Sequence, residues 1–339
     1  MLNLIHAVSG RPWAVRAELA AHVRGLVAKE GITGLRHLAE LKRTVHAFDE
    51  DDDDRPRGAR GGRSSRPVGS VAIIPVFGVL TQREEVIDSA YTRSTDEIAA
   101  EVQAAAEDPK VDAVVMEVAS PGGEVYGVPE AWAAIRDAEK RKPIVAHANS
   151  QMASAALYLG SAASEIWVTP SGEIGSVGVY ALHVNVAKAL EDMGEQWEFV
   201  AADDSPFKVE GNPTEPLSED GRATVKRMVN RYMTMFVRDL ARGRGVSMEH
   251  VRENFGKGRM LSPTEAVSAK MADQIGTLES AIRRAAQLGR ERREGAAAPR
   301  AELHDLEPVA ADPPEPVAPP PPSGPTPEQL AALERLRLL

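Results

Sequence analysis

Apolar residues in the middle of the chain fall into short runs, separated by segments with helical periodicity. Val71–Val79 and Ala113–Val118 are largely apolar runs rich in β-branched residues, the second interrupted only by Glu117, which predicts buried strands of a parallel sheet. Between them, Ser94 stands three residues before Glu97, a spacing typical of the first turn of a capped helix. This part of the chain therefore begins as strand, helix and strand.

The same alternation continues to about residue 290. The further expected elements are strands at Ile144–Ala148 and Ile166–Val168, and helices at Pro129–Lys140, Ser154–Ala163, Ser218–Arg242 and Pro263–Ala272. Repeated β-α-β units of this kind predict an α/β domain over residues 69–290, with parallel strands joined by right-handed crossovers.

The two ends of the chain have different patterns. Residues 1–48 are expected to form a small helical segment, because Leu19, Val23 and Leu26 recur at helical spacing. Residues 49–68, an acidic run followed by Arg, Gly and Ser, read as a disordered linker. Residues 291–339 are rich in Pro and Ala and are expected to be a disordered tail, with a short amphipathic helix at its end.

Composition excludes several classes of protein. The chain has 339 residues, of which 43% are hydrophobic, and its formal net charge of -10 argues against a non-specific nucleic-acid binder. It has no cysteine, so disulfides, thiolate metal sites and cysteine nucleophiles are excluded. No apolar stretch is long enough to span a membrane, so we expect a soluble protein of the cytoplasm without a membrane partner.

In parallel α/β sheets, active sites gather at the carboxyl ends of the strands. The first candidate loop there is Ser120-Pro121-Gly122-Gly123, which follows Ala113–Val118. Backbone N–H groups of Gly122 and Gly123 could form an oxyanion hole for acyl transfer. The alternative is an ordinary Pro-Gly turn.

Ser154, at the start of an Ala-rich helix, is the second candidate. A serine at a helix N-terminus is favoured when it carries developing negative charge, so Ser154 could be a nucleophile. Serine is also a common helix cap, which is the alternative interpretation. Ser150, Ser161 and Ser164 are rival nucleophiles on composition alone.

A serine nucleophile needs a base. His147, His183 and Lys208 are the candidates. A lysine serves only if its surroundings lower its pKa from about 10.4 toward neutrality. The alternatives are core or surface histidines and a solvent-facing loop lysine.

Four segments together resemble peptidase family S49, the signal peptide peptidase A family and its bacteriophage relatives. The first two segments are Val71–Gly78, like the first core strand of the family, and the turn Ser120–Gly123. The third runs from Ala153–Tyr158 to Thr169–Val179, and the fourth from Lys208–Pro213 to Ser218. The resemblance covers roughly residues 69–282.

This resemblance implies the Clp-protease/crotonase-like α/β superfold and a Ser–Lys dyad endopeptidase. Ser154 would be the nucleophile, Lys208 the general base, and Gly122 and Gly123 the oxyanion-hole donors. Ser176 would hydrogen-bond and orient the lysine. The resemblance implies no metal and no cofactor, and it implies a homo-oligomer.

The N-terminal pattern Arg11-Pro12-Trp13-Ala14-Val15 looks like that of phage-encoded family members. We therefore expect a phage or prophage head-maturation protease that cleaves scaffold or portal-region proteins in the host cytoplasm or the procapsid interior, with a preference for small or apolar side chains. The alternatives are a cytoplasmic peptidase for signal peptides, a crotonase-like acyl-CoA enzyme and a non-enzymatic capsid assembly factor. The assembly factor would tolerate Ser154→Ala.

Overall fold

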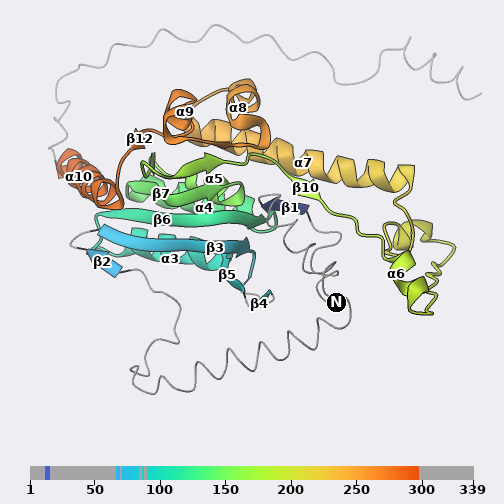
Figure 1. Ribbon diagram of the computed structural model, residues 1–339. Helices are drawn as coiled ribbons and strands as arrows, with labels where there is room; N and C mark the ends of the chain where they lie inside the picture. The colour runs from blue at the N-terminus through green and yellow to red at the C-terminus, as the bar shows by residue number, and fades with distance from the viewer. Residues whose placement is uncertain (1–11, 16–65, 69–70, 84–85, 88–89, 298–339) are drawn as a thin grey trace, which may run out of the picture. The chain divides into compact units, whose positions relative to one another are not determined.

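Parallel strands form the centre of the computed structural model, which describes residues 12–15, 66–68, 71–83, 86–87 and 90–297. They lie in the order β9-β7-β6-β3-β5, and the edge strands β11 and β4 pair antiparallel with β9 and β5 (Figure 1). Their bounds are β3 Val71–Thr81, β4 Val86–Ile87, β5 Ala90–Ser94, β6 Ala113–Glu124, β7 Ile144–Ala153, β9 Glu173–Gly175 and β11 Met260–Leu261.

Shorter strands extend this sheet. Their bounds are β1 Pro12–Val15, β2 Arg66–Val68, β8 Glu165–Val168, β10 Tyr180–Ala181 and β12 Gln274–Ile275. β7 pairs in parallel with β8 along its first half and with β9 along its second half. The end of β7 therefore lies beside β9. As a result, Ser154, which follows β7, is close to Ser176, which follows β9.

Helices cover both faces of the sheet. α3 (Thr95–Glu107), α4 (Val128–Arg141), α5 (Ala155–Gly160) and the second half of α7 (Glu219–Arg244) share one apolar cluster with the sheet. α10 (Leu278–Ala297) packs on the opposite face through Ala281 and Ala285. The remaining helices are α6 Ala187–Asp192, α8 Met248–Asn254, α9 Pro263–Ser268 and the short 3-10 helices η1 Pro206–Val209 and η2 Gly256–Gly258.

Alternation of side chains along β3 shows how both faces are filled. Ile74 and Val76 are fully buried in the cluster under α3, α4 and α5, whereas Val71 is buried under α10. Successive strand residues point to opposite faces, so a strand apolar at every position must be covered on both sides. The largely apolar runs seen in the sequence have this cause.

A polar contact fastens α7 to α5. The Tyr158 hydroxyl donates to Asp239 Oδ2 at 2.5 Å, and the Tyr158 ring stacks on Phe236 with centroids 4.7 Å apart. Asp239 is buried, and Arg238 donates to both of its oxygens at 2.8 and 2.9 Å. The buried carboxylate is thus fully paired, and the short helix that starts after Ser154 is held in place.

Most elements expected from the sequence are confirmed, with shifted ends. Ser94 and Ser218 cap α3 and α7, as the pattern predicts. β6 and β7 run past their apolar stretches, to Glu124 and Ala153. The Ser120–Gly123 segment and residues 149–153 are therefore strand rather than loop.

The expectations for the two ends are corrected where the structure describes them. Pro12–Val15, placed in a helical segment, is strand β1, because its backbone pairs with the edges of β6 and β10. Arg66–Val68, placed in the linker, pairs with β3 as β2. α10 continues to Ala297, so the chain is still helical beyond residue 290. The other expectations for residues 1–65 and 298–339 lie outside the described residues.

Removing the Tyr158 hydroxyl tests the contact between α5 and α7. Tyr158→Phe leaves the buried Asp239 carboxylate short of a donor and should lower the free energy of unfolding by about 1–3 kcal/mol. Tyr232→Phe is the control, because its hydroxyl makes only an exposed 3.4 Å contact with Arg231. Urea unfolding measures both, and equal effects of the two variants contradict the assigned role of Asp239.

Candidate active site

Ser154 occupies a sharp turn between β7 and α5. Its backbone angles are φ 53° and ψ -116°, a conformation that side-chain-bearing residues rarely adopt. The turn is held by two hydrogen bonds: Ser154 N–H donates to Gly175 O at 2.8 Å, and Ser154 O accepts from Tyr158 N–H at 2.9 Å. A strained serine between a strand and a helix is the arrangement of a nucleophile elbow.

The Ser154 side chain does not act as a helix cap. It makes no capping hydrogen bond to the first turn of α5, so the alternative interpretation of this serine is wrong. Its Oγ lies 3.5 Å from Gly178 O, at the long limit of a hydrogen bond. The residue is buried, and this long contact is the one hydrogen bond of its hydroxyl among the described residues.

The predicted oxyanion glycines lie at the end of β6. Gly122 has φ 94°, and its N–H donates to Ser120 Oγ at 3.1 Å, while Ser120 Oγ donates to Gly78 O at 2.7 Å. The Gly122 N–H is therefore already satisfied. A Cβ at Gly123 would come within 1.8 Å of Leu80 O, so only glycine fits there.

Ser176 comes close to Ser154 through the backbone. Ala153 pairs with Gly175, whose carbonyl accepts the Ser154 N–H at 2.8 Å, and Ser176 follows Gly175 directly. Ser176 also has a positive φ, 56°, and its N–H donates to Arg259 O at 2.8 Å. The structure thus brings Ser154 and Ser176 together on two neighbouring strand ends, each with a strained backbone.

Lys208 lies elsewhere. It is an exposed residue of η1, and within the described part of the chain its ammonium has no hydrogen bond or ion pair. Figure 1 shows α6 and the segment that follows it beside the N-terminal end of α7, apart from β7 and α5. Among the described residues, no hydrogen bond joins Lys208 to Ser154, whose Oγ contacts Gly178 O.

The rival bases lie in structural positions. His147 is buried on β7, roughly 20 Å along the strand from Ser154, and its Nε2 lies 3.0 Å from Gly276 O. Its Nδ1 has no hydrogen-bond partner among the described residues. His183 is partly exposed, with Nε2 3.1 Å from Glu215 O. Neither histidine is placed to deprotonate Ser154.

The side chains of two of the rival serines make hydrogen bonds that hold the fold. Ser161 Oγ donates to Tyr158 O at 2.7 Å and accepts from Trp132 Nε1 at 2.9 Å. Ser164 Oγ donates to Glu139 Oε1 at 2.9 Å. Ser150 is exposed on β7 and has a backbone of ordinary strand geometry.

One further candidate was missed from the sequence. The N–H of Ala155, the first residue of α5, has no acceptor in its own helix, because the first N–H groups of any helix lack one. In nucleophile elbows the residue after the serine supplies an oxyanion donor, and that rule could have pointed to Ala155. Across the described residues, no cluster of three or more potential metal ligands is present.

Residues 136–291 match the model of peptidase family S49. The match includes Ser154, Ser176 and Lys208 and begins after Gly123. Among the helices that the structure describes, none is both long and apolar enough to cross a membrane.

Similar proteins include two from bacteriophages. The chain is 32% identical to "Capsid assembly protease C" of Escherichia phage lambda, over 76% of this chain and 56% of that protein. It is 29% identical to "Head-tail preconnector protein GP5" of Enterobacteria phage P21, over 69% of this chain and 46% of that protein. "Protease 4" of Salmonella typhi is 25% identical, over 66% of this chain and 35% of that protein. The chain thus spans about half the length of the two phage relatives.

Among solved structures, a ClpP1 mutant from Listeria monocytogenes overlaps this chain with a TM-score of 0.38 and 16% identity. The overlap covers 62% of this chain and 94% of that one. The repeated β-α-β units expected from the sequence are present in the described sheet.

The strain at Ser154 gives a prediction about stability. Glycine adopts a positive φ freely, so Ser154→Gly should be about 1 kcal/mol more stable than Ser154→Ala, which keeps the strained Cβ and lacks only the hydroxyl. Urea unfolding of the two variants measures the difference. A glycine variant no more stable than the alanine variant contradicts backbone strain at this turn.

A second prediction concerns pH. Burial lowers the pKa of the His147 imidazole from its usual 6.5. The unfolded chain therefore binds a proton at higher pH than the folded chain, and stability should fall as the pH drops below about 6.5. His147→Gln keeps an N–H for Gly276 and should flatten this decline between about pH 7 and 5. Unfolding curves across that range test it, and an unchanged slope contradicts a buried neutral imidazole.

Proposed function

We propose that this chain is a serine endopeptidase in which Ser154 is the nucleophile and Lys208 the general base. The observation that carries the proposal is the strained, buried turn at Ser154, inside the segment that matches family S49. Strain of about 1–3 kcal/mol persists only where surrounding structure enforces it, and such sites cluster in active centres.

The reaction follows from the groups present. Lys208, as general base, takes the Ser154 proton as Oγ attacks the peptide carbonyl, and the N–H groups of Gly123 and Ala155 stabilise the oxyanion. The resulting ammonium gives its proton to the departing amine. Water then attacks the acyl-serine, with Lys208 again accepting a proton, and Ser154 is released. Ser176 orients the lysine.

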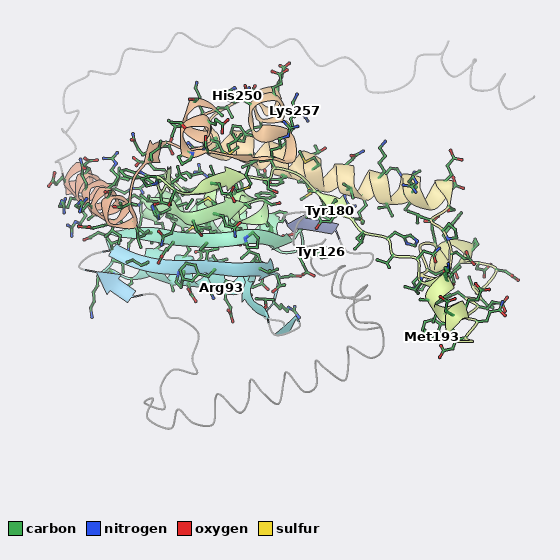
Figure 2. The ribbon with its side chains drawn as sticks, in the orientation of Figure 1. Arg93, Tyr126, Tyr180, Met193, His250 and Lys257 are labelled. Carbon is green, nitrogen blue, oxygen red and sulfur yellow. The ribbon has the colours of Figure 1, made fainter. Side chains whose placement is uncertain are left out.

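In this proposal Lys208 enters the site from a neighbouring copy of the chain. Its segment carries exposed apolar side chains that no described residue covers: Phe207 is 73% exposed, Val200 85% and Phe199 44%. Met193, which directly follows α6, adds to them with 44% exposure (Figure 2). Exposed apolar groups gathered on one segment mark a protein contact. Docking of this segment on a second copy buries these groups and carries Lys208 with them.

A groove beside Ser154 gives room for such a contact. It has a volume of about 910 Å³ and is lined by residues 179–183, by Glu210 and Gly211 of the segment that carries Lys208, by Leu217 and by the first half of α7. Val179 lines it and directly follows Gly178, the carbonyl partner of Ser154 Oγ. A lysine arriving through this groove reaches the nucleophile without crossing the core.

The expected substrates are proteins with small or apolar side chains at the cleavage site. A small apolar recess lined by Val125, Val128, Ala155 and Val179 lies directly after the nucleophile and limits side-chain size. Likeness to the two bacteriophage proteins favours scaffold or portal-region proteins as substrates, in the host cytoplasm or the procapsid, over leftover signal peptides.

Three substitutions test the dyad. Ser154→Ala and Lys208→Ala should each lower cleavage of a denatured, fluorophore-labelled protein by at least about 100-fold. Lys188→Ala, an exposed lysine on α6, should cleave like the wild type. Thermal melting checks that all three are folded. Wild-type activity of Ser154→Ala favours the assembly-factor alternative, and wild-type activity of Lys208→Ala removes the lysine from the mechanism.

Mixing the two inactive variants tests where the lysine comes from. If each site takes Ser154 from one copy and Lys208 from the next, random co-assembly leaves about a quarter of the sites intact. A mixture refolded together should therefore regain about a quarter of the wild-type activity. A mixture as inactive as its components contradicts a dyad shared between copies.

A further inference from the structure

Strand β1 lies in a position that the sheet leaves open next to the candidate nucleophile. β7 pairs with β6 as far as Met152, opposite Ser120, and then turns away at Ser154. β1 takes its place: Val15 pairs with Gly122, Ala14 with Gly123 and Trp13 with Glu124, all antiparallel. Residues 12–15 thus continue the sheet along the glycines at the end of β6.

The other edge of β1 pairs with β10. Pro12 lies opposite Ala181 and Trp13 opposite Tyr180, and among the described strands β10 pairs with β1 alone. Figure 2 shows Tyr180 beside this strand. Without residues 12–15, the carboxyl end of β6 and the strand β10 would be two unpaired strand edges, with room for one strand between them. Such a cleft takes an extended peptide through main-chain hydrogen bonds.

The direction of β1 matters. It runs from Pro12, level with the far end of β6, to Val15, level with Gly122 and nearest to the end of β7. Its carboxyl end therefore leads toward Ser154. A substrate strand in the same direction presents the peptide bond that follows it to the nucleophile.

We infer that Pro12–Val15 occupies the strand-binding cleft of its own chain as a substrate mimic and excludes other peptides. This inference depends on the proposed peptidase function in one respect: that function makes the displaced peptide a substrate. The strand joins β6 and β10 through backbone contacts, so it competes with any extended peptide. Because it is tethered, it competes at a high effective concentration.

A disulfide staple tests the position of the strand. The chain has no cysteine, so Trp13→Cys with Tyr180→Cys introduces one possible pair. Antiparallel partners have Cα atoms about 4.5–5.5 Å apart, within disulfide reach. Lys110→Cys with Trp13→Cys is the control, because Lys110 precedes β6 and lies at its opposite end. Intact mass under mild oxidation reads out an intramolecular bond.

Peptide binding tests exclusion without relying on catalysis. All variants carry Ser154→Ala, and the probe is a fluorescent synthetic peptide of residues 11–17, followed by anisotropy. Ala14→Pro cannot donate to a strand partner and should bind the probe at least about tenfold more tightly than its parent. The oxidised staple should not bind, and reduction should restore binding. Ala14→Val, which keeps the backbone N–H, should bind like the parent.

The outcomes separate this inference from the peptidase proposal. Staple formation in the Tyr180 pair but not the Lys110 pair, with binding lost on oxidation, supports the inference even if no variant cleaves protein. Equal oxidation of the two pairs, a disulfide-linked dimer, or equal probe binding by the locked, parent and proline forms overturns it, whatever the peptidase assay shows.

Discussion

The turn at Ser154 is the constraint on which the rest of the site depends. β7 must end at Ala153 and α5 must begin at Ala155, so a single residue reverses the chain with φ 53°. The hydrogen bond from Ser154 N–H to Gly175 O fixes this turn against β9, and the Tyr158–Asp239 contact fixes the helix behind it. Both bonds hold Ser154 in a position where its hydroxyl does not cap α5. The end of β7 that leads into Ser154 pairs with β6 at Ser120, just before the two glycines. The reactivity proposed for Ser154 therefore comes from the strand order, which places β6, β7 and β9 side by side.

The same anchoring bears on the proposal that the base comes from a neighbouring copy of the chain. The second half of α7 is buried against α5 through Phe236 and Asp239, while most of its first half is exposed. Lys208 belongs to the segment before that exposed half, with Phe207 and Val200 open to solvent. A segment that exposes apolar groups together with the proposed base, Lys208, gains from docking on another copy. In that proposal, assembly and activation are one event.

Much of the fold could be predicted because it depends on local pattern. The apolar runs at β3 and β6, and the caps at Ser94 and Ser218, are signals that neighbouring residues determine. Pro12–Val15 could not be predicted as a strand, because its partners stand more than a hundred residues away. The same holds for Gly122, whose N–H is taken by Ser120 Oγ only because Gly78 positions that hydroxyl. Ser154 and Ser176 came from resemblance to a family, and the structure adds their shared backbone strain.

The central claim is that a strained serine becomes a nucleophile only when a neighbouring copy supplies Lys208. The most direct measurement is peptidase activity per chain across a dilution series from micromolar to nanomolar protein, with the oligomeric state measured by sedimentation in the same samples. Activity per chain should follow the assembled fraction and vanish in the monomer, because the monomer holds Ser154 without its base. A monomer as active per chain as the assembly would contradict the claim.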